Sequence, residues 1–137
     1  MFVESQKEKT IERLEKLYQN LDAGGLTKDR YLEMQEQMGL PVEEDKIPPG
    51  YEDLPTIAVD AMNTFNQLGD RAYPDIGYVG KDYTNLNHFI ELYDIDDKEF
   101  FLHILTWLDS RAIKQSQEQL KREHEKLKRK SNVGKRS

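Results

Sequence analysis

Apolar residues recur at spacings of three and four over most of this chain, and this spacing limits the possible folds more than any other feature. Between residues 4 and 22 the pattern is formed by Ile11, Leu14, Leu17, Tyr18 and Leu21, which fall on one face of a helix. Only 36% of the residues are hydrophobic and 34% are charged, so any core must be built from narrow helical stripes. We therefore expect an all-α protein.

The N-terminal segment 1–39 is predicted to form a helical hairpin. Glycines after Ala23 end the first helix, Thr27 caps a second one, and Gly39 followed by Pro41 ends it. The stretch RLEKLYQNLDAGGLTKDRYLEMQEQMG resembles the short two-helix module called SHOCT, in which spaced leucines precede a glycine turn and a threonine cap. That resemblance implies an interaction or oligomerisation element.

Three further segments follow the hairpin. Residues 40–54 combine prolines with acidic residues and are expected to form an extended linker. Residues 55–113 are predicted to form a three-helix core: a helix ending near Gly69, a short helix capped by Asp82 or Thr84, and a long helix that starts at Asp96 with Glu99 in capping-box spacing. Residues 114–137 continue this last helix as a charged arm.

The stretch Asp70–Leu86, DRAYPDIGYVGKDYTNL, is expected to be a loop that interrupts the helices. Its GYVGK segment is not a phosphate-binding loop, because that motif needs a glycine where Asp75 stands and a serine or threonine in place of Asp82. Two interpretations stay open. The tyrosines either cover helix ends as a packed corner with their hydroxyls in water, or they form a protein-binding surface.

The sequence offers no catalytic, cofactor-binding or metal-binding set. Cysteine is absent, and His88, His103 and His124 lie far apart with no metal-ligand spacing. The acidic run that starts at Asp94 lacks the glycine and glutamate of a calcium-binding loop. The chain has no signal-peptide-like or membrane-spanning apolar run. We expect a soluble, intracellular protein that is not an enzyme, needs no cofactor and does not bind membranes.

Charge is distributed unevenly along the chain. Residues 1–113 contain 11 Lys/Arg against 23 Asp/Glu, whereas residues 114–137 contain 9 against 3. A basic arm on an acidic body is compatible with a nucleic-acid-associated regulator, although glutamates are interleaved with the basic residues. The candidate phosphate-binding residues are Lys121, Arg122, Lys126, Lys128, Arg129, Lys130, Lys135 and Arg136.

Residues 54–113 resemble small tail-assembly chaperones of tailed bacteriophages. The resemblance consists of a Gly-x-Asp-Tyr-x-x-Leu segment followed by a short helix, and it is carried by Gly80, Asp82, Tyr83, Leu86, Leu92, Tyr93 and Ile95. It implies a non-enzymatic adaptor or chaperone in the host cytoplasm or on the virion. Its partners would be a phage tail or other virion protein, or a second copy of the chain. The candidate contact residues are Tyr73, Tyr78, Tyr83, Phe89, Tyr93 and Trp107.

Overall fold

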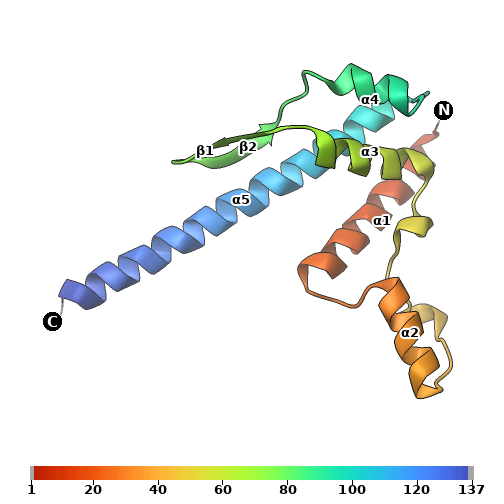
Figure 1. Ribbon diagram of the computed structural model, residues 1–137, viewed down its shortest axis with the longest axis horizontal. Helices are drawn as coiled ribbons and strands as arrows, with labels where there is room; N and C mark the ends of the chain where they lie inside the picture. The colour runs from red at the N-terminus through yellow and green to blue at the C-terminus, as the bar shows by residue number, and fades with distance from the viewer. Residues whose placement is uncertain (1, 136–137) are drawn as a thin grey trace. The chain divides into compact units, whose positions relative to one another are not determined.

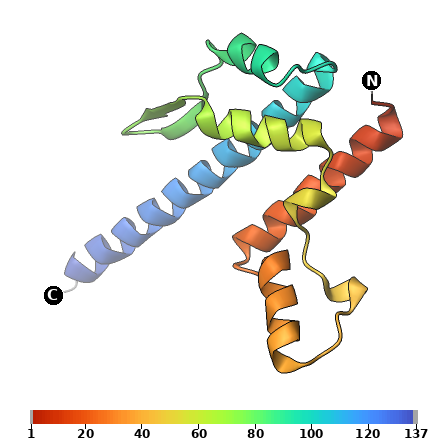
Figure 2. The same cartoon turned by 45° about the vertical axis from the view of Figure 1, so that its right-hand side comes forward.

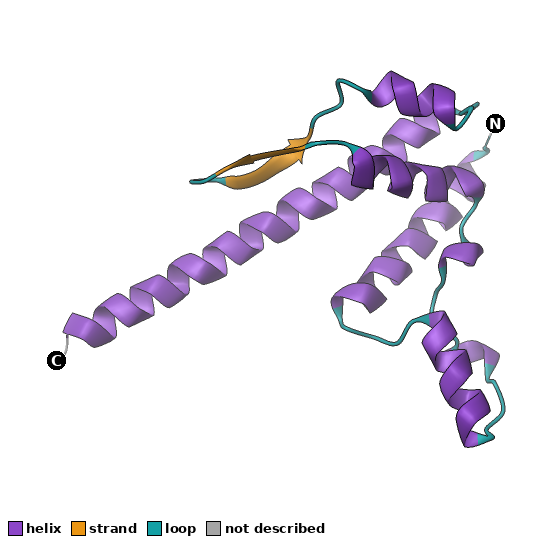
Figure 3. Ribbon diagram, in the orientation of Figure 1, coloured by secondary structure: helices purple, strands orange, loops and turns teal. Residues whose placement is uncertain are grey.

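The computed structural model describes residues 2–135, which are mostly helical and include one two-stranded antiparallel sheet (Figures 1 and 3). The chain divides into two compact units, with the boundary between Asp60 and Ala61. In chain order the elements are α1 (Glu4–Asp22), α2 (Lys28–Met38), the 3₁₀ helices η1 (Glu44–Lys46) and η2 (Tyr51–Asp53), α3 (Thr56–Gln67), β1 (Asp70–Tyr73), β2 (Gly77–Lys81), α4 (Leu86–Leu92) and α5 (Lys98–Lys135).

In the first unit, the helix ends follow the predicted caps. The Thr27 hydroxyl accepts a 3.2 Å hydrogen bond from the amide of Arg30, and Gly39 ends α2 in the left-handed conformation with φ of 65°. The acidic linker is not simply extended, because it contains η1 and η2. Lys28 holds η2 by ion pairs to Glu52 (3.1 Å) and Asp53 (3.3 Å).

In the second unit, α5 supplies the largest share of the core. Its buried face contains Phe100, Phe101, Ile104, Leu105 and Leu108. The N-cap is Asp97 rather than the predicted Asp96, since the carboxylate of Asp97 accepts a 3.1 Å hydrogen bond from the amide of Phe100. The apolar stripe of α3 is buried at Ala61, Met62 and Leu68. Helices form at the three places predicted between residues 55 and 113, as α3, α4 and the first part of α5.

The expectation of an all-α fold was wrong between residues 70 and 81. That segment is a β-hairpin, in which Asp70 pairs with Lys81 and Tyr73 pairs with Gly77. The turn begins at Pro74, whose fixed φ suits the first turn position, and ends at Gly77, which has φ of 73°. Helix periodicity is absent here, so the short strands pair with each other instead. In two views the hairpin runs beside α5 (Figures 1 and 2).

Candidate functional site

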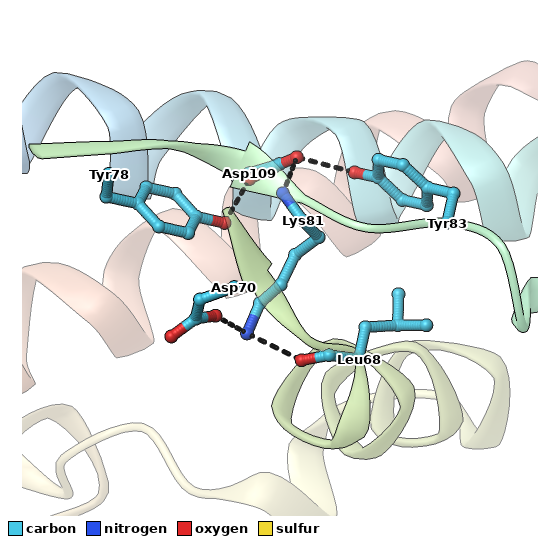
Figure 4. Close-up of polar contacts among 6 residues, drawn as sticks. All are labelled: Leu68, Asp70, Tyr78, Lys81, Tyr83 and Asp109. Atoms are coloured by element: carbon cyan, nitrogen blue, oxygen red, sulfur yellow. Dashed lines mark hydrogen bonds and ion pairs between the residues drawn. The ribbon is translucent and has the colours of Figure 1, made fainter. Parts of the chain in front are cut away.

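The carboxylate of Asp109 is the centre of a polar cluster beneath the hairpin. Asp109 lies on α5 and is 7% exposed. Its Oδ2 accepts a 2.7 Å hydrogen bond from the Tyr83 hydroxyl and a 3.1 Å hydrogen bond from the main-chain amide of Lys81. Its Oδ1 accepts a hydrogen bond from the Tyr78 hydroxyl. We call Tyr78, Lys81, Tyr83 and Asp109 the Asp109 cluster (Figure 4).

The side chain of Lys81 joins this cluster to the end of α3. Its ammonium group forms a 2.5 Å ion pair with Asp70 and donates a 3.3 Å hydrogen bond to the carbonyl oxygen of Leu68 (Figure 4). The same ammonium lies 4.5 Å from the centre of the Phe65 ring, within the range of a cation–π interaction. Lys81 therefore connects both strands to α3, while its main chain contacts α5.

A β-bulge gives the hairpin this double attachment. The pairing shifts between Arg71 and Ala72, so that Val79 is the extra residue on β2. In a regular strand, amides three residues apart point to opposite edges. The extra residue resets this alternation. As a result, the amides of Tyr78 and Lys81 both point to α5, where they donate to Ser116 (3.2 Å) and Asp109 (3.1 Å).

Two glycines allow β2 to approach α5 closely. A methyl group on Gly80 would lie 3.3 Å from Oδ2 of Asp109, and one on Gly77 would lie 2.9 Å from Cδ1 of Leu120. Gly80 also has φ of 134°, a conformation that residues with a side chain rarely adopt. The glycines of the GYVGK segment thus serve packing against α5 rather than phosphate binding.

The electrostatics of the cluster favour a fixed protonation pattern. Burial alone would raise the pKa of Asp109, but the hydrogen bonds from Tyr78, Tyr83 and the Lys81 amide outweigh it and hold that pKa below its ordinary value. Burial and the neighbouring Asp109 carboxylate raise the pKa of both tyrosines well above 10. At neutral pH the cluster is one carboxylate with two protonated phenols.

This arrangement suits structural support better than acid–base chemistry. Both oxygens of Asp109 accept hydrogen bonds from the protein itself, and Lys81 is bound by Asp70 and Leu68. A cavity of about 340 Å³ lies beside the cluster, between the hairpin and α5, and includes Phe65, Gln115 and Gln119 in its lining. Within residues 2–135, no three His, Asp or Glu side chains are grouped so that they can hold a metal ion.

The structure places the predicted contact residues in different surroundings. Tyr73 is 50% exposed beside the hairpin turn, whereas the hydroxyls of Tyr78 and Tyr83 are bound to Asp109 instead of facing water. Phe89 is buried. Tyr93 is partly buried and accepts a 3.3 Å hydrogen bond from Gln67, and Trp107 is partly buried on α5. Only Tyr78 and Tyr83 of this set meet in one cluster.

Asp109 and Ser116 were missed by the sequence analysis. A signal for Asp109 exists, because it interrupts an apolar helix face between Leu105 and Ala112. A carboxylate at such a position needs hydrogen-bond donors, and the tyrosines of the nearby hairpin provide them. Ser116 carries no comparable signal, since it lies where the helix surface becomes polar.

Seven of the eight candidate phosphate-binding residues, from Lys121 to Lys135, lie on α5 beyond the hairpin. The side chains are exposed at Lys121, Arg122, Lys126, Lys128, Arg129 and Lys130. Arg136 and the side chain of Lys135 lie outside the described part of the structure. Among the described helices, none is both long and apolar enough to cross a membrane.

Comparisons with protein-family models, with curated proteins and with solved structures give no match to this chain.

Proposed function

We propose that this protein is a non-enzymatic assembly adaptor, of the tail-assembly-chaperone type found in tailed bacteriophages, and that it acts through protein–protein contacts. The sequence resemblance over residues 54–113 supports this class. Several residues that carry the resemblance have supporting roles in the second unit: Tyr83 donates a hydrogen bond to Asp109, a side chain at Gly80 would crowd Asp109, and Ile95 is buried. The partner would be a tail or other virion protein, and self-association belongs to the same class of contact.

The observation that carries the proposal is the exposure of apolar side chains on a firmly held hairpin. Tyr73 is 50% exposed and Ile76 is 58% exposed, and both lie at the turn. The Asp109 cluster and the Lys81–Asp70 pair fix the hairpin from two sides. A contact surface that is already ordered loses less conformational entropy on binding, and a tyrosine buries a large area there.

The proposal is tested by a nuclease-treated pull-down from phage-producing cells, with the captured proteins identified by mass spectrometry. The bait is the full chain, and the test variant is Tyr73→Ser combined with Ile76→Ser. Leu127→Ser is the matched control, because Leu127 is 65% exposed but lies far along the arm. We expect a virion protein to be recovered by the unchanged chain and the control, and recovery to fall strongly with the double variant. Recovery of no virion protein, or equal recovery by all three, contradicts the proposal.

A second candidate function is nucleic-acid binding by the arm, and the exposure of the six basic side chains between Lys121 and Lys130 favours it. Fluorescence anisotropy with a labelled DNA duplex of about 20 base pairs tests it on the full chain and on a chain ending at Leu120. Binding that weakens steeply with salt and is lost with the shorter chain supports this candidate. Salt-independent binding, or equal binding by both chains, contradicts it.

A further inference from the structure

The outer edge of β1 has main-chain groups that the hairpin itself does not use. In an antiparallel pair, residues alternate between those that bond across the pair and those that point away from it. The amides of Tyr78 and Lys81 point away, because they donate to Ser116 and Asp109. Their partners on β1, Ala72 and Asp70, therefore also point away from β2.

The neighbouring pair supports this alternation. The amide of Asp82 donates a 2.8 Å hydrogen bond to the carbonyl of Gly69, so this pair bonds across the hairpin and the next pair, Asp70 with Lys81, does not. The described residues contain no third strand, and all four residues of β1 are exposed. The N–H and C=O groups of Asp70 and Ala72 thus face an open edge.

We propose that this edge binds an extended segment of a partner protein as an added antiparallel strand. Arg71 and Tyr73 share one face of β1, so the partner residues opposite them are two positions apart. An acidic residue opposite Arg71 and a β-branched or aromatic residue opposite Tyr73 make favourable cross-strand pairs. Asp70, on the other face, is already neutralised by Lys81. The inference rests on the proposed adaptor function in that it requires a protein partner.

A second copy of the chain fits this edge poorly. If the β1 strands of two copies pair about a two-fold axis, the residues whose N–H and C=O groups face the open edge must lie opposite each other. The register centred on Arg71 opposes like charges. The register centred on Asp70 places Ala72 opposite Leu68, whose N–H already donates to the carbonyl oxygen of Thr64. The register centred on Ala72 places Asp70 opposite Pro74, which begins the turn and has no N–H. The edge therefore favours a different chain.

An NMR titration of the full ¹⁵N-labelled chain tests the proposal. The probe is the peptide acetyl-SVTETS-amide, and the two comparison peptides carry lysine in place of glutamate or proline in place of the first threonine. We expect the probe to shift the amide signals of Asp70–Tyr73 and to slow hydrogen exchange at the Ala72 amide. The lysine peptide should bind at least about threefold more weakly, since it replaces attraction to Arg71 with repulsion. The proline peptide should also bind more weakly, because it lacks one N–H.

The charge reversal Arg71→Glu provides the reciprocal test, with Lys98→Glu as a control of equal charge change at another exposed position. We expect Arg71→Glu to reverse the preference between the glutamate and lysine peptides, and Lys98→Glu to leave it unchanged. Equal binding of all three peptides, shifts away from β1, or concentration-dependent self-association that protects Ala72 overturns the proposal. Peptide binding at β1 without recovery of a virion protein in the pull-down contradicts only the adaptor function. Recovery of a virion protein without peptide binding at β1 contradicts only the proposal that this edge accepts a strand.

Discussion

The hydroxyl of Tyr83 donates a 2.7 Å hydrogen bond to Oδ2 of Asp109, which fastens the chain leaving β2 to the middle of α5. The two residues are 26 positions apart and belong to different elements. Tyr78 binds the other oxygen of the same carboxylate from the opposite end of β2. One buried carboxylate therefore fixes both ends of the strand.

Replacing Asp109 by asparagine should destabilise the second unit. Asparagine keeps only one acceptor oxygen and no negative charge, so one tyrosine hydroxyl must turn to accept from its NH₂ and the remaining hydrogen bonds lose their charged acceptor. We expect Asp109→Asn to lower the free energy of unfolding by about 2–3 kcal/mol, measured by urea titration. Asp75→Asn in the exposed turn is the control, with an expected change within about 0.5 kcal/mol. Equal midpoints for the two variants would contradict the role of Asp109.

Removing the hydroxyls of Tyr78 and Tyr83 tests whether their hydrogen bonds to Asp109 stabilise the fold. Tyr78→Phe and Tyr83→Phe each keep the ring but lose a hydrogen bond to a charged acceptor, so each should cost about 1.5–3 kcal/mol of unfolding free energy. Tyr73→Phe is the control at an exposed position and should change stability little. A thermal or urea unfolding series compares the three. Unchanged stability in all three variants would show that the Asp109 cluster contributes nothing.

The cluster also predicts how stability depends on pH. The pKa of Asp109 is lower in the folded chain, so its contribution is complete above the unfolded value of about 4 and is lost as pH falls through the folded value. The pKa values of Tyr78 and Tyr83 are higher in the folded chain, so stability decreases as pH rises above about 10. Melting temperatures between about pH 3 and pH 11 should show both losses. In Asp109→Asn the decrease in melting temperature at low pH should be smaller. A pH profile identical to that of the unchanged chain would contradict this prediction.

The helices were predictable from the sequence because their signals are local. The apolar spacing, Thr27 and Gly39 define α1 and α2 without reference to the rest of the chain. The hairpin was not predicted, because its strands have only four and five residues and its turn lacks the Asn-Gly pair typical of short hairpins. The bulge at Val79 depends on the pairing register and on α5, so no local pattern indicates that Tyr78 and Lys81 face the same helix.

Gly80 should tolerate no side chain, whereas nearby Gly69 should. Alanine at Gly80 combines an unfavourable φ of 134° with a 3.3 Å approach to Asp109. We expect Gly80→Ala to cost about 1–3 kcal/mol. A methyl group on Gly69 would extend into open space, and the φ of Gly69 is not positive, so Gly69→Ala should leave stability unchanged or slightly improved. Urea unfolding measures the free energy of unfolding of both variants. A similar loss at both positions would contradict the claim that the conformation and close packing of Gly80 require a glycine.

The point at which α5 is shortened should decide whether the hairpin remains attached. Ser116 accepts the 3.2 Å hydrogen bond from the Tyr78 amide, and Leu120 lies so near Gly77 that an added methyl group would come within 2.9 Å of it. A chain ending at Ile113 lacks both Ser116 and Leu120, whereas one ending at Leu120 keeps them and removes the basic residues from Lys121 onward. We expect the shorter chain to show faster hydrogen exchange at the amides of β2, while the chain ending at Leu120 exchanges like the full chain. Equal exchange in all three would mean that Asp109 and Lys81 hold the hairpin without help from the next two turns of α5, and a loss in the chain ending at Leu120 would assign a structural role to the basic arm.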